Sequence, residues 1–124
     1  MQGIRGAITV EKNEKALIFA AVQELLAKLL ARNAIRTEDI GAAIFSATPD
    51  LDAAFPAAAA RQIGWEAVPL FGAQEQAVAD GLKRCVRVLL LVNTDKQQRD
   101  VQHVYLGGAA RLRPDLAERT EGGA

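Results

Sequence analysis

Two hydrophobic periodicities follow one another in the first third of the chain. Residues 3–10 (GIRGAITV) are rich in β-branched side chains and punctuated by glycine, which predicts a strand. Residues 14–32 then repeat apolar side chains at helical spacing: Ile18, Val22, Leu25, Leu26, Leu29 and Leu30. That spacing predicts an amphipathic helix, and Asn13 is a suitable N-cap for it. Residues 41–47 (GAAIFSA) predict a short buried strand that ends at Thr48-Pro49-Asp50.

The second half of the chain is strand-rich. A second helix is expected to begin at Phe55-Pro56, where proline suits the first helical position, and to end at Gly64. Residues 65–71 (WEAVPLF) predict a strand whose Pro69 is typical of a sheet edge. Residues 85–92 (CVRVLLLV) form a continuous apolar run that indicates a strand buried on both faces. Residues 101–106 (VQHVYL) predict one more short strand.

The resulting order, β-α-β-α-β-β-β, predicts an α+β (mixed α/β) fold with about five strands in a mixed sheet and two helices on one face. We expect residues 1–116 to form a single domain and the polar, glycine-rich residues 117–124 to form a flexible tail. A sheet covered on one side only is thin for a monomer. Its open side is therefore a natural surface for oligomerisation.

The composition of the chain argues against nucleic acids and membranes as binding partners. Fifteen basic and fifteen acidic residues among 124 give a net charge of zero, without the basic excess of proteins that bind nucleic acids or membrane surfaces. A single cysteine, Cys85, excludes an internal disulfide and favours a reducing compartment. No apolar run reaches the roughly 18 residues of a transmembrane helix, and the N-terminus lacks a signal-peptide pattern. We therefore expect a cytoplasmic protein that binds neither membranes nor nucleic acids.

The chain has too few histidine, cysteine and serine residues for several common kinds of catalytic or metal site. The chain has one histidine (His103), one cysteine and one serine (Ser46). A structural zinc site needs about four ligands of the Cys/His type. Neither Ser46 nor His103 lies in a motif typical of a catalytic triad, and no glycine-rich phosphate loop is present. An enzyme with this inventory is expected to use no metal, no nucleotide and no covalent intermediate.

Two arginines lie within predicted strands. Arg87 shares a strand face with Cys85 and with leucines, and a guanidinium cannot be neutralised by deprotonation. It either pairs with an internal carboxylate or lines an anion-binding cleft. Arg5 lies between Gly3 and Gly6, and is either an ordinary exposed strand residue or a ligand group.

The other polar candidates also have a structural and a functional interpretation. Tyr105 and His103 share a strand face, where a core role is the ordinary outcome, and Glu75 follows a strand as an ordinary solvated carboxylate would. Arg61 and Arg113 could be simple surface residues. Taken together, arginines with one tyrosine and one glutamate favour a small ligand with several negative charges, because the guanidinium fork matches carboxylates.

Eight short motifs occur in an order that resembles one enzyme family: residues 3–7 (GIRGA), 46–51 (SATPDL), 54–57 (AFPA), 68–69 (VP), 74–75 (QE), 83–88 (KRCVRV), 103–106 (HVYL) and 112–116 (LRPDL). They resemble the small, monofunctional chorismate mutases with a barrel-like α/β fold, and not the all-helical chorismate mutases. The resemblance implies the cofactor-free [3,3] rearrangement of chorismate to prephenate in phenylalanine and tyrosine biosynthesis. It also implies a homotrimer that forms a pseudo-α/β barrel, with active sites between subunits.

The resemblance also implies roles for individual residues. Arg87 is expected to face the ether oxygen of the breaking bond, where negative charge accumulates. Arg5 and Tyr105 are expected to bind the carboxylate of the enolpyruvyl side chain, with Arg5 holding the reactive conformer. Glu75 is expected to accept a hydrogen bond from the ring hydroxyl.

The remaining site residues are substrate-binding in this interpretation. Phe55, Ala57 and Arg61 are expected from the neighbouring subunit, and Arg113 beside Leu112 assists near the mouth. Gly72 stands where the family often has a cysteine beside the ring hydroxyl. Two further departures are Ala58, where the family often has a lysine, and a deletion near Gly64.

Two other hypotheses remain open at this point. A trimeric imine or enamine deaminase also places arginine-lined sites between subunits, by analogy of fold alone. A binding protein for an aromatic-pathway metabolite is the other hypothesis, with Gly72 and Ala58 as signs of lost catalysis. Turnover of an imino acid, or binding of chorismate without turnover, would distinguish them.

Overall fold

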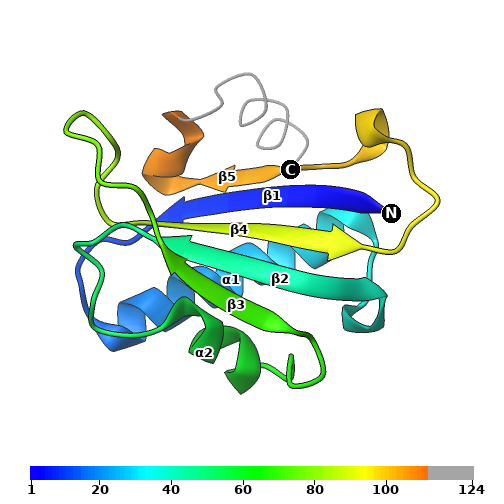
Figure 1. Ribbon diagram of the computed structural model, residues 1–124, viewed down its shortest axis with the longest axis horizontal. Coiled ribbons are helices and arrows are strands. Elements are labelled where there is room, and N and C mark those ends of the chain that lie inside the picture. The colour runs from blue at the N-terminus through cyan, green and yellow to red at the C-terminus, as the bar shows by residue number, and fades with distance from the viewer. Residues whose placement is uncertain (112–124) are drawn as a thin grey trace.

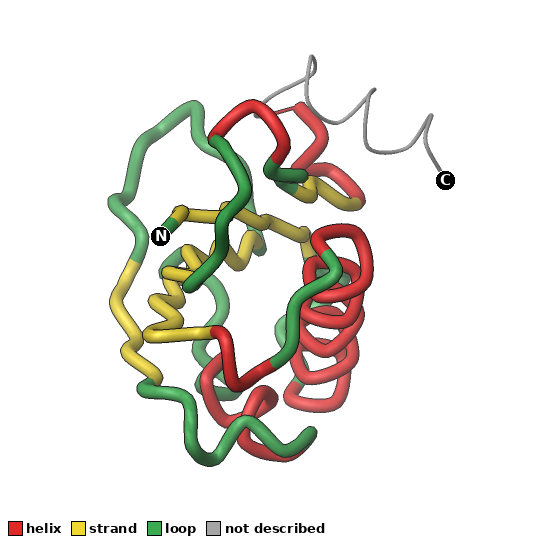
Figure 2. Tube along the Cα trace, turned by 90° about the vertical axis from the view of Figure 1, so that its right-hand side faces the viewer, coloured by secondary structure: helices red, strands yellow, loops and turns green. Residues whose placement is uncertain are grey.

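The computed structural model describes residues 1–111, which form one five-stranded mixed sheet with both helices on one face. Figures 1 and 2 show this two-layer arrangement. The strands are β1 (Gln2–Thr9), β2 (Ile40–Ala47), β3 (Leu70–Gln74), β4 (Cys85–Val92) and β5 (Val104–Leu106). The helices are α1 (Lys15–Asn33) and α2 (Pro56–Gln62). The predicted fold class is confirmed for this part of the chain, and the predicted tail, Leu112 and Arg113 lie outside it.

The strand order β3-β2-β4-β1-β5 places β4 at the centre of the sheet. β4 is antiparallel to both β1 and β2, whereas the edge strands β5 and β3 run parallel to β1 and β2. In this register Arg87 lies between Ala7 on β1 and Ser46 on β2. The topology therefore places the predicted catalytic arginine in the middle of the sheet.

The core lies between the sheet and α1. The apolar stripe predicted for α1 is buried, with Ile18, Val22, Leu25, Leu26 and Leu29 at 0% exposure. The helix packs directly on β1 at Gly6, because a Cβ there would lie 2.8 Å from Cδ1 of Leu29. At Gly6, therefore, any larger residue would force the Leu29 side chain to shift in the packed core.

The central strand β4 corrects one expectation. Its continuous apolar run predicts burial on both faces, but only the face toward the helices is closed, by Val86, Val88, Leu90 and Val92. On the other face Arg87 is exposed, and Leu89 and Leu91 are partly exposed. The prediction was wrong for most of this face in the single chain, because the described residues cover it only at the start of β4, where Cys85 is buried with Ala7, Tyr105 and Ala109. We refer to it as the open face, and to the opposite side as the helix face.

The strand predicted over residues 65–71 is also corrected. Trp65 lies in the core at 2% exposure, and β3 begins only at Leu70. Trp65 starts a turn in which its carbonyl accepts from the N–H of Val68 at 3.3 Å. Pro69 lacks an N–H, but its carbonyl accepts from Ala43 at 2.9 Å. β3 is the edge strand that Pro69 suggested, displaced toward the C-terminus.

Asn13 does not cap α1 as predicted. The N-cap residue is Glu14, without a side-chain hydrogen bond. The Asn13 side chain instead contacts the loop before α2, where its Nδ2 donates to Asp52 at 2.6 Å and its Oδ1 accepts from the N–H groups of Asp52 and Ala53. Asn13 therefore ties the start of α1 to the loop that carries Phe55.

At the other end of α1, the fully buried Asn33 binds the backbone of the segment before β5, where a strand was predicted. Of the predicted strand 101–106, only Val104–Leu106 pairs with β1. Asn33 binds both backbone groups of Gln102: its Nδ2 donates to the carbonyl at 2.9 Å and its Oδ1 accepts from the N–H at 2.8 Å. This amide holds the approach to β5, and with it the position of Tyr105.

Candidate active site

Arg87 and Glu75 form an ion pair on the open face. Arg87 Nε lies 3.1 Å from Glu75 Oε2, with the two side chains 48% and 25% exposed. The internal carboxylate considered for Arg87 is therefore present. The guanidinium is still half exposed, so its terminal nitrogens can also meet a ligand. The two interpretations of Arg87 are thus compatible.

Glu75 is held by β2 as well as by Arg87. Its N–H donates to the carbonyl of Ala47 at 2.8 Å, which continues the β2–β3 pairing by one residue. Its Oε2 accepts a hydrogen bond from Ser46 Oγ at 2.8 Å. The sequence analysis placed Ser46 in the motif at residues 46–51 and considered it as a nucleophile, but it assigned this residue no role at the site. Its contact with Glu75 depends on a pairing between distant segments, which no local pattern reveals.

Arg5 and Tyr105 join Arg87 around one hollow of about 330 Å³ on the open face. Ser46 and Leu89 also line it. The register explains the convergence, because Ala7 on β1 pairs with both Arg87 and Tyr105. The N–H of Arg5 donates to Nδ1 of His103 at 2.9 Å, which links β1 to the segment before β5. The structure therefore brings together Arg5, Arg87 and Tyr105.

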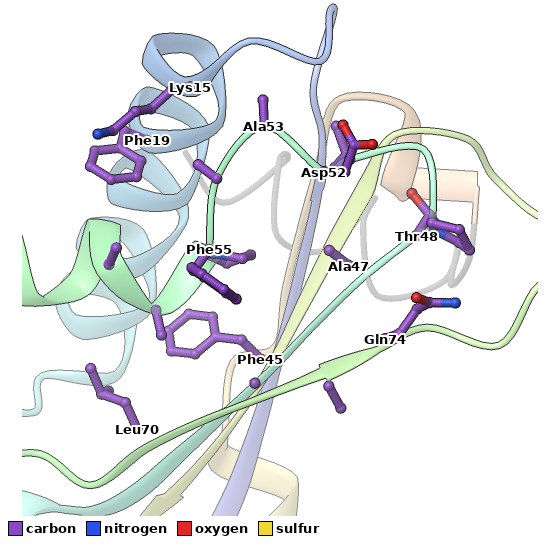
Figure 3. Close-up of a pocket in the computed structure, with 18 of the residues that line it drawn as sticks. Lys15, Phe19, Phe45, Ala47, Thr48, Asp52, Ala53, Phe55, Leu70 and Gln74 are labelled. Carbon is purple, nitrogen blue, oxygen red and sulfur yellow. The ribbon is translucent and has the colours of Figure 1, made fainter.

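The other predicted residues gather on the helix face. Phe55, Ala57, Arg61 and Gly72 line a larger hollow of about 820 Å³ between α1, α2 and β3 (Figure 3). Phe55 is 79% exposed, although it is a large aromatic side chain. Nothing lies within 4 Å of where a Cβ on Gly72 would be. The single chain thus divides the predicted site into two groups on opposite faces of the sheet.

The helix-face hollow holds two residues that sequence reasoning missed. Lys15 and Phe19 line it from α1, with Lys15 Nζ 5.5 Å from the centroid of the Phe19 ring (Figure 3). Ala58, the noted departure, lines the same hollow and contributes no charge. Among residues 1–111, neither Lys15 nor Arg61 has an ion-pair partner. This hollow therefore offers two cations to an anionic ligand.

Two ionisable groups near the start of β4 have shifted pKa values. Burial raises the pKa of the Cys85 thiol, and the nearby Arg87 offsets only part of that rise. Burial would also raise the pKa of Asp50, but hydrogen bonds from Thr48 and from the N–H of Arg84 outweigh it and lower the pKa. Cys85 is thus a neutral thiol near pH 7, which makes it a poor nucleophile. Asp50 is an anion that fixes the loop after β2.

The described part of the chain offers no cluster of three or more His, Cys, Asp or Glu side chains that could hold a metal ion. Within the same residues, no helix is both long and apolar enough to span a membrane.

Comparisons with known proteins agree on one family. The sequence profile of type I chorismate mutases matches residues 1–116. The chorismate mutase AroH of Thermus thermophilus is 54% identical over 117 residues, which are 94% of this chain and 96% of that protein. The AroH of Bacillus subtilis (strain 168) is 45% identical over 118 residues, with 94% and 93% covered.

A solved structure supports the same assignment. The chorismate mutase from Clostridium thermocellum superposes with a TM-score of 0.88 at 45% sequence identity, and the match covers 90% of this chain and 99% of that one. The resemblance inferred from the eight motifs is therefore confirmed. The five-stranded sheet with its helices on one face, the profile match and the two relatives lead to one conclusion: the chain belongs to the type I chorismate mutase family.

Proposed function

We propose that this chorismate mutase rearranges chorismate to prephenate at a site centred on Arg87 and Glu75. The observation that carries the proposal is the Arg87–Glu75 pair, which shares the open face with Arg5 and Tyr105. The reaction is an intramolecular [3,3] shift, so atoms are neither gained nor lost. Fixed charges that match the transition state are enough to accelerate such a step.

Arg87 is the catalytic residue in this proposal. As the carbon–oxygen bond breaks, negative charge accumulates on the ether oxygen. A guanidinium whose Nε is engaged by Glu75 directs its terminal nitrogens elsewhere, and the adjoining hollow is where the substrate would meet them. A preorganised donor of this kind is worth about 10²- to 10³-fold in turnover.

Glu75 and Arg5 would orient the substrate. Glu75 accepts a hydrogen bond from the ring hydroxyl, and its negative charge suits the partly cationic ring. Arg5, with Tyr105, binds the side-chain carboxylate and holds the folded conformer in which the reacting carbons meet. Holding that conformer lowers the entropic part of the barrier. No proton transfer is needed, so we expect the chemical step to vary little with pH around neutrality.

A homotrimer would unite the two groups of site residues. Phe55, Ala57 and Arg61 lie on the helix face and Arg87 on the open face, so one chain cannot close both around one substrate. A neighbouring copy seated on the open face would supply the missing wall. Exposed Ile44 and Phe71, with the partly exposed Leu89 and Leu91, give that face the apolar character of an interface.

The remaining residues of the proposed site follow from the resemblance to the family. Gly72 contacts the substrate through its backbone, and Leu112 and Arg113 contribute to binding by their resemblance to the family. We propose that the enzyme needs no cofactor or metal and works in the cytoplasm, where a single cysteine remains reduced.

The first experiment follows the ultraviolet absorbance of chorismate with purified protein in the presence of EDTA. Loss of chorismate with prephenate as the product supports the proposal. A folded protein that leaves chorismate unchanged would overturn it. Turnover of an imino acid without turnover of chorismate would favour the deaminase hypothesis instead.

A second experiment tests the shared sites. Arg87→Ala and Arg61→Ala chains, each with its own tag, are co-expressed, and the mixed oligomers are purified through both tags. If each site joins Arg87 of one subunit to Arg61 of the next, every mixed trimer has both intact groups in about a third of its sites. Activity well above that of either single variant is expected. No gain on mixing would show that the sites are not shared.

A further inference from the structure

We propose that Ser46 is a positioning residue for this reaction: its hydroxyl fixes the Glu75 carboxylate so that one oxygen faces Arg87 and the other faces the substrate. The inference rests on the proposed function and adds a residue to it. Ser46 touches no reacting atom in this role and acts through Glu75.

The geometry places two donors on one carboxylate oxygen. Ser46 lies on β2 directly opposite Arg87 on β4, and both side chains are on the open face. Ser46 Oγ donates to Glu75 Oε2 at 2.8 Å, and Arg87 Nε lies 3.1 Å from the same atom. Two donors saturate the lone pairs that a carboxylate oxygen usually offers.

The contact between Glu75 and Arg87 falls on Glu75 Oε2 and Arg87 Nε, and Ser46 binds the same Oε2. A ligand would therefore meet Glu75 at Oε1 and Arg87 at its terminal nitrogens. Oε1 can accept from a substrate hydroxyl, while the terminal nitrogens of Arg87 can donate to an ether oxygen. The arrangement gives the acceptor and the donor separate roles, which the reaction needs.

Ser46 is required because Arg87 alone holds Glu75 weakly. Glu75 follows the last residue of β3, and residues 76–81 after it are all exposed. A long glutamate side chain at such a position can adopt several rotamers. An ion pair with half-exposed partners is weakened by water and salt. The short serine hydroxyl is held on β2, which is paired with strands on both sides, so it adds a directional restraint that salt does not screen.

The test compares Ser46→Ala with Ser46→Thr, which retains the hydroxyl and suits a strand. Ser46→Ala is expected to lower kcat/KM roughly 10- to 100-fold, mainly through kcat, because it removes a hydrogen bond to a charged group. Ser46→Thr is expected to retain activity within about threefold. Thr37→Ala is the matched control, because Thr37 Oγ1 also donates to a carboxylate, that of Glu38 at 3.2 Å, on an exposed turn.

A double-variant cycle separates positioning from packing. In a Glu75→Ala background the Ser46 hydroxyl has no carboxylate to hold, so Ser46→Ala should cost less than about twofold there. A purely structural serine would cause the same loss with or without Glu75. Equal losses in the two backgrounds, or a Ser46→Thr variant as inactive as Ser46→Ala, would overturn the inference. Thermal unfolding of each variant shows whether it is folded, and Ser46→Cys replaces Ser46→Ala if the latter is not; a weak thiol donor is expected to give an intermediate loss.

Failure of this inference differs from failure of the proposed function. If wild-type protein and Thr37→Ala turn over chorismate and Arg87→Ala does not, the function stands. An unchanged kcat/KM in Ser46→Ala would then reject the role of Ser46 alone. A wild-type protein without turnover would reject both.

Discussion

The two groups of predicted site residues differ in how firmly the chain holds them. On the open face, Arg87, Glu75 and Ser46 are joined through one carboxylate oxygen on neighbouring segments of the sheet. On the helix face, Phe55 is largely exposed and Arg61 has no ion-pair partner among residues 1–111. The groups that must carry charge are prearranged within the chain, whereas those that shape the cavity are not.

Physical chemistry explains this division. A charge stabilises a transition state only if its direction is fixed before the reaction begins, because reorganisation would consume the gain. A hydrophobic wall needs only the right volume, and dispersion contacts are not directional. Substitutions on the open face should therefore mainly lower kcat, whereas those on the helix face should mainly raise KM.

The largest expected effect is at Arg87. Arg87→Ala and Arg87→Lys should each lower kcat by about 10²- to 10³-fold, because a lysine ammonium cannot reproduce the guanidinium fork. Steady-state kinetics with chorismate measure the loss, and circular dichroism controls for folding. Nearly normal activity in Arg87→Lys would contradict the assigned contact with the ether oxygen.

Asn33 holds the segment before β5, the strand that carries Tyr105 on the open face. Asn33→Ala leaves the N–H and the carbonyl of Gln102 without their partner, and should lower the free energy of unfolding by about 2–4 kcal/mol. Urea denaturation measures this loss. Asn93→Ala, at an exposed position after β4, is the comparison variant and should change stability by less than about 1 kcal/mol. Equal losses in the two variants would contradict the role of Asn33.

A smaller effect is expected on the helix face at Lys15. Lys15→Gln removes one of the two cations of the larger hollow, and should raise KM about two- to threefold at low salt with little change in kcat. The difference should shrink as salt is added. Lys28→Gln, on the same helix but paired with Glu24 at 3.5 Å, is the control. A Lys15→Gln effect that falls on kcat and ignores salt would show that this cation does not attract substrate.

The smallest effect concerns Cys85 at the start of β4, beside Glu75 and Arg87. Because burial raises the pKa of this thiol, the native state keeps its proton after the unfolded chain has lost it. The free energy of unfolding should therefore fall as pH rises above about 9.0, the ordinary pKa, and this component should be missing in Cys85→Ala. Urea denaturation at a series of pH values measures both proteins. Identical slopes above that pH would show that the thiol does not contribute.

Local patterns predicted the elements that carry their own signal. The apolar stripe of α1, Pro56 at the first turn of α2 and Gly64 after it, with φ of +94°, are all where the sequence indicated. The placement of Arg87 on a strand face follows from alternation. These features depend on neighbours within a few residues.

Features that depend on distant partners were not predictable. Asn13 was expected as an N-cap because it precedes a helix. Its side chain instead makes three hydrogen bonds with Asp52 and Ala53, which are distant in sequence. Trp65 has strand propensity, but burial in the core determines its place. Ser46 begins one of the eight motifs, but the motif gives it no role, because only the pairing of β2 with β3 and β4 brings it to Glu75 and Arg87. Sequence patterns thus named Arg5 and Glu75, which would contact the substrate, but not Ser46, which holds Glu75 in place.

The position of β1 in the sheet has a consequence for biosynthesis. β1 is the first strand in the chain, but its neighbours are β4 and β5, and Gly6 pairs with Val88 and Val104. During translation β1 therefore leaves the ribosome long before β4 and β5 are synthesised. Until then its backbone N–H and carbonyl groups have no strand partner and can pair with other chains. Pairings between such distant segments also slow folding. Arg5 can join Arg87 and Tyr105 only when synthesis of the domain is nearly finished.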